Sequence, residues 1–252
     1  MKNLLGVADY GMNVWYGGAF NLEQRLDLLR SCGIDGIEWL KASSMSEAMQ
    51  NACLFHRKGM DFASCDMGNP ELSMKCASAF GKEYVWFTMP CGRDVDFDDY
   101  CRRANAFTCA AKYYNLKAAI HNHLGNRVQD EAEIVEFMER VPDAALLLDI
   151  AHLHAAGGDN VAMVNKYASR LAAVHFKDIF YKDKSIGFDR WWDRLRFCEL
   201  GGGNAGLDYE AIARALVDNQ YSKWVLIEHD THLREPEIDL KISADILREL
   251  FK

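Results

Sequence analysis

The sequence predicts a single (β/α)8 barrel over residues 1–252. Three observations lead to this fold class. The length of 252 residues is typical of such a barrel, short apolar runs alternate with longer amphipathic stretches, and no linker-like change in composition divides the chain. A doubly wound open sheet would instead call for a glycine-rich turn after the first strand, and the chain reads VADYGMNVW there, without GxGxxG.

Eight short runs rich in apolar and β-branched residues are predicted as strands. They cover residues 4–8, 36–40, 62–66, 84–89, 117–121, 145–149, 171–176 and 224–228. Apolar residues at helical spacing mark the stretches between and after them. The predicted helices cover residues 21–32, 46–58, 70–80, 96–115, 130–140, 160–168, 208–219 and 236–251. Strict alternation of eight strands with eight helices is the pattern of a closed barrel.

One connection is much longer than the others. After the seventh strand, a loop over about residues 179–206 precedes the helix near Asp208, whereas barrel loops usually have about 2–6 residues. Long insertions at this position are usually lids or subunit contacts, as in a homo-oligomer, and the alternative is a decorated surface loop. The loop contains Trp191 and Trp192, which we expect to be buried against another part of the protein.

Charge and composition restrict the partners. The chain has 29 Lys and Arg against 37 Asp and Glu, so its net charge of −8 disfavours nucleic acid or an anionic membrane as partner. The first apolar run is broken by Asp9 and Gly11, too soon for a signal peptide, and no run reaches the ~18 apolar residues of a membrane span. Eight cysteines without a CxxC pair predict reduced thiols, not a zinc knot. These features predict a cytoplasmic protein.

The carboxyl ends of barrel strands carry the active site. In the second half of the chain, the predicted strands end in His121, Asp149, His175 and Glu228. A single histidine would more often be a packed core residue, but four ligand-type groups on consecutive strand ends predict one divalent cation. Two imidazoles and two carboxylates suit Mn²⁺, Co²⁺, Fe²⁺ or Zn²⁺ and do not select among them.

Other polar residues flank this set. His123 lies two residues after His121 and shares its face if the strand continues. His152 follows Asp149 in a DxxH pattern, which places its imidazole beside the carboxylate for contact with metal or substrate. Lys177 shares a face with His175; it either binds an anionic or carbonyl oxygen or pairs with a neighbouring acid.

Candidate substrate contacts come from other parts of the chain. Glu38 ends the second predicted strand and can accept hydrogen bonds from sugar hydroxyls, unless it forms a structural salt bridge. Trp15, Trp191 and Trp192 can cover the apolar face of a sugar ring, with plain packing as the alternative.

Six segments together resemble the xylose-isomerase-like barrel superfamily of sugar phosphate isomerases and epimerases. They are AAIHNHLG, LLLDIAH, VHFKD, VLIEHD, GIDGIEWL and GGGNAGLDY. The resemblance implies metal ligands at His121, Asp149, His175 and Glu228. His121 stands where the epimerases carry a glutamate, one of their two opposed acid–base groups. The histidine-rich segment HNHLGNRVQ is more similar to the inosose dehydratases of that superfamily.

The family IV apurinic endonucleases of the same fold share the DxxH feature. They use three zinc ions and need further histidines from earlier strands, where this chain offers Asp66 and Met89. The net charge of −8 also disfavours DNA as substrate.

We therefore expect a metal-dependent lyase that acts on a keto-sugar or keto-cyclitol through an enolate. His152 or Glu228 is expected as the base and His123 or Lys177 as the acid. An isomerase or epimerase with the same enolate is the alternative, and a sugar-binding barrel without catalysis represents a different class.

Overall fold

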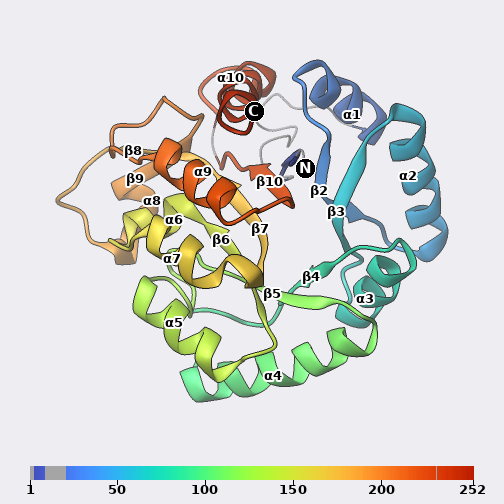
Figure 1. The fold of residues 1–252 in the computed structure, drawn as a ribbon, viewed down its shortest axis with the longest axis horizontal. Helices are drawn as coiled ribbons and strands as arrows, with labels where there is room; N and C mark the ends of the chain where they lie inside the picture. The colour runs from blue at the N-terminus through green and yellow to red at the C-terminus, as the bar shows by residue number, and fades with distance from the viewer. Residues whose placement is uncertain (1–2, 9–20, 231) are drawn as a thin grey trace.

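The computed structural model describes residues 3–8, 21–230 and 232–252, and its main sheet is the expected barrel (Figure 1). Eight parallel strands are paired in the order β3-β2-β1-β10-β7-β6-β5-β4. These strands are β1 (Leu4–Val7), β2 (Gly36–Lys41), β3 (Asp61–Asp66), β4 (Tyr84–Trp86), β5 (Lys117–His121), β6 (Ala145–Asp149), β7 (Leu171–Phe176) and β10 (Trp224–Ile227). The predicted fold class is confirmed.

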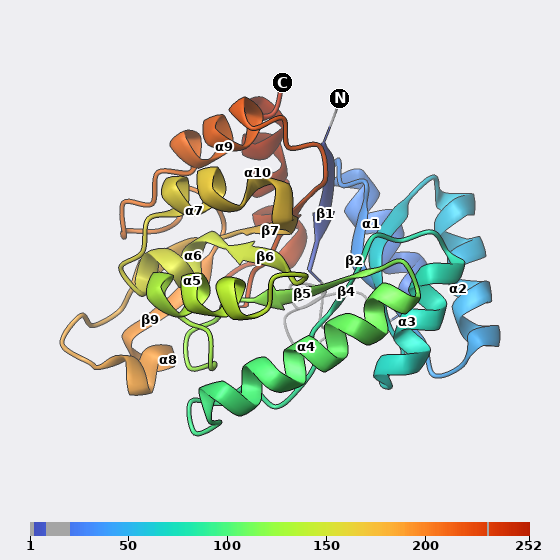
Figure 2. The same ribbon diagram turned by 60° about the horizontal axis from the view of Figure 1, so that its bottom comes forward.

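Helices surround this sheet on the outside (Figures 1 and 2). They are α1 (Leu22–Ser31), α2 (Met45–Lys58), α3 (Pro70–Ala79), α4 (Phe97–Tyr113), α5 (Glu131–Arg140), α6 (Ile150–Ala155), α7 (Asn160–Tyr167), α9 (Tyr209–Asp218) and α10 (Pro236–Leu250), with the 3-10 turn η3 (Ala168–Arg170) before β7. Most begin at a polar residue that accepts a hydrogen bond from the first turn, such as Asn21 and Ser44. Helix α6 has only 6 residues and was not predicted from the sequence.

The barrel is nearly closed. Among the described residues, β3 and β4 share no backbone ladder. A side chain bridges them instead, because Ser64 Oγ donates a hydrogen bond to the carbonyl oxygen of Tyr84 at 2.7 Å.

The barrel interior is filled by small strand residues and a few aromatic rings. Its buried cluster is formed by Ala63, Tyr84, Ala119, Ala145, Leu147, Ala172, Ala173 and Leu226. Two glycines make room for the ring of Trp224, since a Cβ atom on Gly6 or Gly36 would lie 2.9 or 2.8 Å from it. This packed interior closes the amino end of the barrel and leaves polar strand ends at the other.

The long connection after β7 is an ordered arm. It contains an antiparallel pair, β8 (Asp178–Tyr181) and β9 (Leu195–Cys198), joined through η4 (Phe188–Arg190) and α8 (Trp191–Arg194). Figure 2 shows α8 and β9 on the side of the barrel away from the chain termini. The sequence predicts a loop for this segment, because two four-residue strands give little periodic signal.

The base of the arm is held by Asp178. Its Oδ1 accepts a hydrogen bond from the N–H of Ile179 at 2.7 Å, and its Oδ2 accepts from the N–H groups of Gly201 and Gly203 at 3.1 and 3.2 Å. The aspartate therefore binds the glycine-rich loop after β9.

We expected both tryptophans of the arm to be buried, but Trp191 is only partly buried and Trp192 is exposed. Trp191 packs with its ring centroid 5.7 Å from that of Phe197, whereas Trp192 is 54% exposed. Adjacent positions on a helix point about 100° apart, so only one of the two rings faces the barrel.

No helix of the described residues is long and apolar enough to cross a membrane.

Candidate active site

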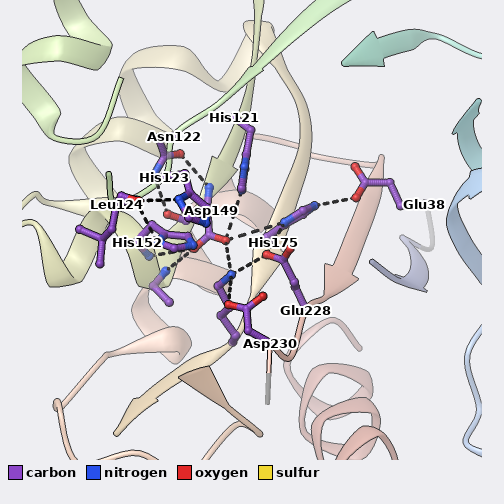
Figure 3. A network of polar contacts seen from close by, with 12 residues as sticks. Glu38, His121, Asn122, His123, Leu124, Asp149, His152, His175, Glu228 and Asp230 are labelled. Carbon is purple, nitrogen blue, oxygen red and sulfur yellow. Dashed lines mark hydrogen bonds and ion pairs between the residues drawn. The ribbon is translucent and has the colours of Figure 1, made fainter. Parts of the chain in front are cut away.

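Four side chains from consecutive strands meet at the carboxyl edge of the barrel (Figure 3). They are His121, Asp149 and His175 at the ends of β5, β6 and β7, and Glu228 directly after β10. One potential ligand atom of each lies within 4.8 Å of the others. The structure thus brings together the four residues that the sequence analysis selected as metal ligands.

This donor set fits a divalent cation. Ligands on opposite sides of an ion, each at ~2.0–2.2 Å, lie about 4.0–4.4 Å apart, so atoms already within 4.8 Å need only small movements to share one ion. The side chains of Asp149 and His175 are fully buried, and those of Glu228 and His121 are 4% and 8% exposed. Water therefore has little access to compete for these ligands.

The two oxygens of Asp149 have different tasks. Asp149 is the N-cap residue of α6, and its Oδ1 accepts hydrogen bonds from the N–H groups of Ala151 at 3.0 Å and His152 at 2.8 Å. Its Oδ2 remains directed at the cluster, 3.4 Å from His121 Nε2 and 3.8 Å from His175 Nδ1. One carboxylate therefore fixes the start of the helix that carries His152 and also offers a ligand atom.

Asn122 fixes the position of β5 against β6. Its side-chain amide donates to the carbonyl oxygen of Asp149 at 3.0 Å and accepts from the N–H of Asp149 at 2.9 Å. Asn122 is fully buried, and it holds the strand ends of His121 and Asp149 at a defined separation.

His175 lies between two carboxylates. Its Nδ1 is 2.9 Å from Glu228 Oε2, and its Nε2 is 3.0 Å from Glu38 Oε2. Burial disfavours a charged imidazole, but Glu38 and Glu228 outweigh burial and raise the pKa of His175 to about 10.

Lys177 contributes a buried ammonium group to the same cluster. Its Nζ lies 2.5 Å from Glu228 Oε2, 3.1 Å from Asp149 Oδ2 and 3.3 Å from Asp230 Oδ2, and 4.3 Å from the centroid of the Phe197 ring. Burial alone would lower the pKa of Lys177, but these three carboxylates raise it above its ordinary value. Lys177 is therefore a permanent cation at neutral pH.

The pKa values of the Asp149 and Glu228 carboxyl groups are shifted downwards, in the opposite direction to that of Lys177. Burial raises the pKa of Asp149 and of Glu228, yet the charge of Lys177 overcomes burial and holds the pKa of both carboxyl groups below the ordinary value. Both are ionised, as metal ligands must be.

A closely packed pair of histidines flanks the cluster, with ring planes inclined by 38°. The ring centroids of His123 and His152 are 3.8 Å apart, and that of His152 is 6.0 Å from His121. Burial lowers the pKa of His123 to about 4, with further contributions from His121 and Lys177. Burial also lowers the pKa of His152 well below its ordinary value. Both imidazoles are therefore neutral near pH 7.

Hydrogen bonds at Leu124 define which nitrogen of each imidazole carries the proton. The carbonyl oxygen of Leu124 lies 2.6 Å from His123 Nδ1, so that nitrogen donates. The N–H of Leu124 lies 3.2 Å from His152 Nδ1, so that nitrogen accepts. In the neutral rings, His123 Nε2 is then an acceptor and His152 Nε2 carries a hydrogen. The Nε2 atom of His152 is buried without a partner among the described residues.

The arm covers the histidine pair. The ring centroid of Trp191 lies 5.6 Å from His123 and 5.9 Å from His152, and Phe197 lies 4.4 Å from His152. Trp191 and Phe197 form an apolar cover that limits the access of water to the imidazoles.

The remaining histidines of this rim do not join the cluster. His154 Nε2 faces the carbonyl oxygen of Ala205 at 3.4 Å, and His229 Nε2 faces Ser243 Oγ at 3.1 Å. His232 Nδ1 pairs with Asp239 of α10 at 3.2 Å. These three are turned toward neighbouring elements. Trp15 lies outside the described residues.

Several neighbours of the cluster were not predicted from the sequence. Tyr84 Oη and Trp86 Nε1 donate to Glu38 Oε1 at 3.0 and 2.7 Å, and the Trp86 ring centroid lies 4.7 Å from that of His121. Their spacing of two residues on one strand was the available signal, since it places both on the same face. Asp230, two residues after Glu228, carried the same signal.

The chain is similar in sequence to a known protein family and to curated enzymes. The family model described as a xylose isomerase-like TIM barrel matches residues 71–250. An inosose dehydratase from Lactiplantibacillus plantarum is 29% identical over 155 residues, which is 58% of this chain and 49% of the relative. The chain thus spans about half the length of the curated relatives that it matches.

Solved structures share the fold over nearly the whole chain. The probable 3-DHS dehydratase AsbF from Bacillus anthracis superimposes with a TM-score of 0.76 at 15% identity, covering 98% of this chain and 99% of its own. The IOLI protein with a bound zinc atom superimposes with a TM-score of 0.74 at 17% identity, covering 100% of this chain and 98% of its own.

Proposed function

The chain belongs to the xylose isomerase-like TIM barrel family, and we propose that it is a metal-dependent lyase that eliminates water or an alcohol from a keto-sugar or keto-cyclitol. The observation that carries this proposal is the closely packed pair of neutral histidines beside a buried cluster of four potential ligand atoms. The similarity to inosose dehydratases supports the reaction class.

The proposed ligands are His121, Asp149, His175 and Glu228. A divalent cation held by these residues would supply Lewis acidity toward the substrate carbonyl, which would acidify the C–H bond next to it. The ammonium of Lys177 lies against the same carboxylates and adds a fixed positive charge that favours negative charge on the substrate oxygen. Its raised pKa makes Lys177 a poor proton donor.

The hydrogen bonds at Leu124 favour one distribution of the acid and base roles. His123 offers Nε2 as an acceptor and serves as the base, whereas His152 offers its Nε2 hydrogen as a hydrogen bond to the leaving oxygen. This distribution is the reverse of the sequence-based expectation for the two histidines. The spacing of the residues gave no information on the tautomers, which depend on the backbone of Leu124.

Glu228 is a less suitable base. Its Oε2 accepts from both His175 Nδ1 and Lys177 Nζ, and its pKa is held well below the ordinary value. A carboxylate stabilised in this way has low proton affinity and functions better as a ligand.

The elimination balances with these groups. The C–H bond next to the ketone breaks, its proton goes to His123 Nε2, and the electron pair forms a C=C bond. The β C–O bond then breaks while its oxygen accepts a hydrogen bond from Nε2 of His152. The oxygen takes the proton that His123 holds at Nε2 and leaves as water or an alcohol. The product is an unsaturated ketone or its tautomer, and both imidazoles are again neutral.

The experiment combines metal analysis with product identification. The purified chain, reconstituted separately with Mn²⁺, Co²⁺, Fe²⁺ and Zn²⁺, is expected to hold about one ion per chain. Incubation with 2-keto-myo-inositol and with 3-keto-glucosides should give loss of water or of the aglycone in mass spectrometry. Conversion without a mass change would support the isomerase or epimerase alternative. Binding without conversion would support a sugar-binding barrel, and absence of both metal and binding would refute the site.

A further inference from the structure

Both carboxylate oxygens of Glu38 have polar partners inside the barrel. It lies on β2, opposite the metal ligands, and is fully buried. Its Oε1 accepts hydrogen bonds from Tyr84 Oη at 3.0 Å and from Trp86 Nε1 at 2.7 Å. Its Oε2 lies 3.0 Å from Nε2 of His175 (Figure 3).

The two donors from β4 hold Glu38 in one orientation. A hydroxyl and an indole N–H both reach the same oxygen, so rotation of the carboxylate would leave buried donors without a partner. The Trp86 ring is itself packed against Trp39 and His121, with centroids 4.5 and 4.7 Å apart. Glu38 Oε2 is therefore presented to His175 from a rigid wall of the barrel.

This contact determines which nitrogen of His175 is available to a cation. An ionised carboxylate only accepts hydrogen bonds, so Nε2 of His175 has to carry the hydrogen that it donates to Glu38. The other nitrogen, Nδ1, is directed at the cluster and lies 3.8 Å from Asp149 Oδ2. In the metal-free chain Nδ1 donates its hydrogen to Glu228 Oε2 at 2.9 Å, and it would give up that hydrogen on binding a cation. Metal-binding histidines commonly have their second nitrogen fixed by a carboxylate in this way.

We propose that Glu38 is a positioning residue that fixes the rotation and tautomer of His175, so that Nδ1 faces the cation. The inference rests on the metal site of the proposed function and gives Glu38 a task other than contact with sugar hydroxyls. Neither oxygen of Glu38 needs to reach substrate for this task, because each is already engaged by side chains of β4 or β7.

The decisive substitution is Glu38→Gln. It keeps the shape of the side chain and lets the amide oxygen accept from Tyr84 and Trp86. The amide NH₂ then faces His175 Nε2 and favours the tautomer with the hydrogen on Nδ1, which blocks the nitrogen directed at the cation. We expect the Kd for Mn²⁺ to rise by about 10- to 100-fold, the usual effect of losing such a partner.

The matched control is Tyr84→Phe. This substitution removes a hydrogen bond to Oε1 of Glu38 but leaves the pair between Oε2 and His175 in place. Its Kd for Mn²⁺ should stay within about threefold of the wild-type value, whereas a loss equal to that of Glu38→Gln would overturn the proposal. If Glu38→Gln fails to fold, Glu38→Asp replaces it, because this substitution withdraws the carboxylate from His175 by one methylene. It should raise the Kd for Mn²⁺ by at least about threefold.

A second readout does not depend on metal. The hydrogen on His175 Nε2, shared with a buried carboxylate, should give a downfield, slowly exchanging proton NMR signal in the metal-free chain, assigned by its loss in His175→Gln. The signal should persist in Tyr84→Phe and disappear or move upfield in Glu38→Gln. If the wild type binds no Mn²⁺ but shows this pattern, the metal function fails while the pairing stands. An unchanged signal or an unchanged Kd in Glu38→Gln overturns the inference.

Discussion

Replacement of Asp178 by Ala tests how the arm is attached to the barrel. The carboxylate is 5% exposed and accepts three backbone hydrogen bonds, from Ile179, Gly201 and Gly203. Alanine would leave these three N–H groups without their partner at the junction of β8 with the loop after β9. The same residue follows Lys177 directly in sequence, but the hydrogen bonds of its two oxygens run to this loop.

The size of the effect follows from these bonds. A buried donor that loses its partner costs about 1–3 kcal/mol, and the loop can rehydrate part of the three groups once the carboxylate is gone. We therefore expect a loss of about 3 kcal/mol in the free energy of unfolding. For a chain of this length, that corresponds to a Tm lower by about 6–12 °C.

The Asp178→Ala substitution should also affect the candidate active site. Trp191 and Phe197 belong to the arm and cover His123 and His152. A loosened arm admits water to the two imidazoles, so kcat/KM should fall in Asp178→Ala even at temperatures where the barrel remains folded.

The assay is urea unfolding followed by circular dichroism, with the Tm from calorimetry. Asp183→Ala is the matched control, because Asp183 lies in the same arm and its carboxylate accepts hydrogen bonds from the N–H and Oγ of exposed Ser185; it should leave the Tm unchanged. A loss of less than about 1 kcal/mol in Asp178→Ala, which is less than one buried hydrogen bond, would refute the reasoning.

Three further predictions concern the cluster itself. Glu228→Gln should lower kcat/KM by at least about 100-fold together with the metal content; normal turnover at normal metal content would limit Glu228 to a structural role. Activity of the metal-loaded enzyme should decline as the pH falls toward about 4, because His123 accepts a proton only while neutral and burial lowers its pKa to about 4; a pH profile of kcat/KM that is unchanged in His123→Gln would exclude it as the base. The free energy of unfolding of the metal-free chain should depend on pH in the opposite direction and decrease as the pH rises. The pKa of His175 is raised from 6.5 to about 10, against burial, by Glu38 and Glu228, so its contribution to stability is complete below about pH 6.5 and is lost as the pH rises toward about 10. Urea titrations across this range should show the decline in the wild type and a flatter profile in His175→Gln.

The sequence by itself determined the barrel and the four candidate ligand residues. Apolar runs and helical periodicity are local signals, and eight alternations of them leave few ways to bury every strand. The same pattern assigned His121, Asp149, His175 and Glu228 to strand ends, and parallel strands in a barrel bring their carboxyl ends to one edge. The proximity of the four side chains therefore follows from the order of the strands and from the position of each residue at a strand end.

The tertiary structure decided what each group can do. The tautomers of His123 and His152 depend on the backbone of Leu124, and the charge of His175 depends on Glu38, which is 137 residues away in sequence. The structure of the arm also could not be predicted from the sequence. Its short strands are stabilised by each other and by Asp178, and they carry no long periodic signal. Roles in acid–base chemistry are set by burial and by partners distant in the chain, and these exist only once the barrel has closed around them.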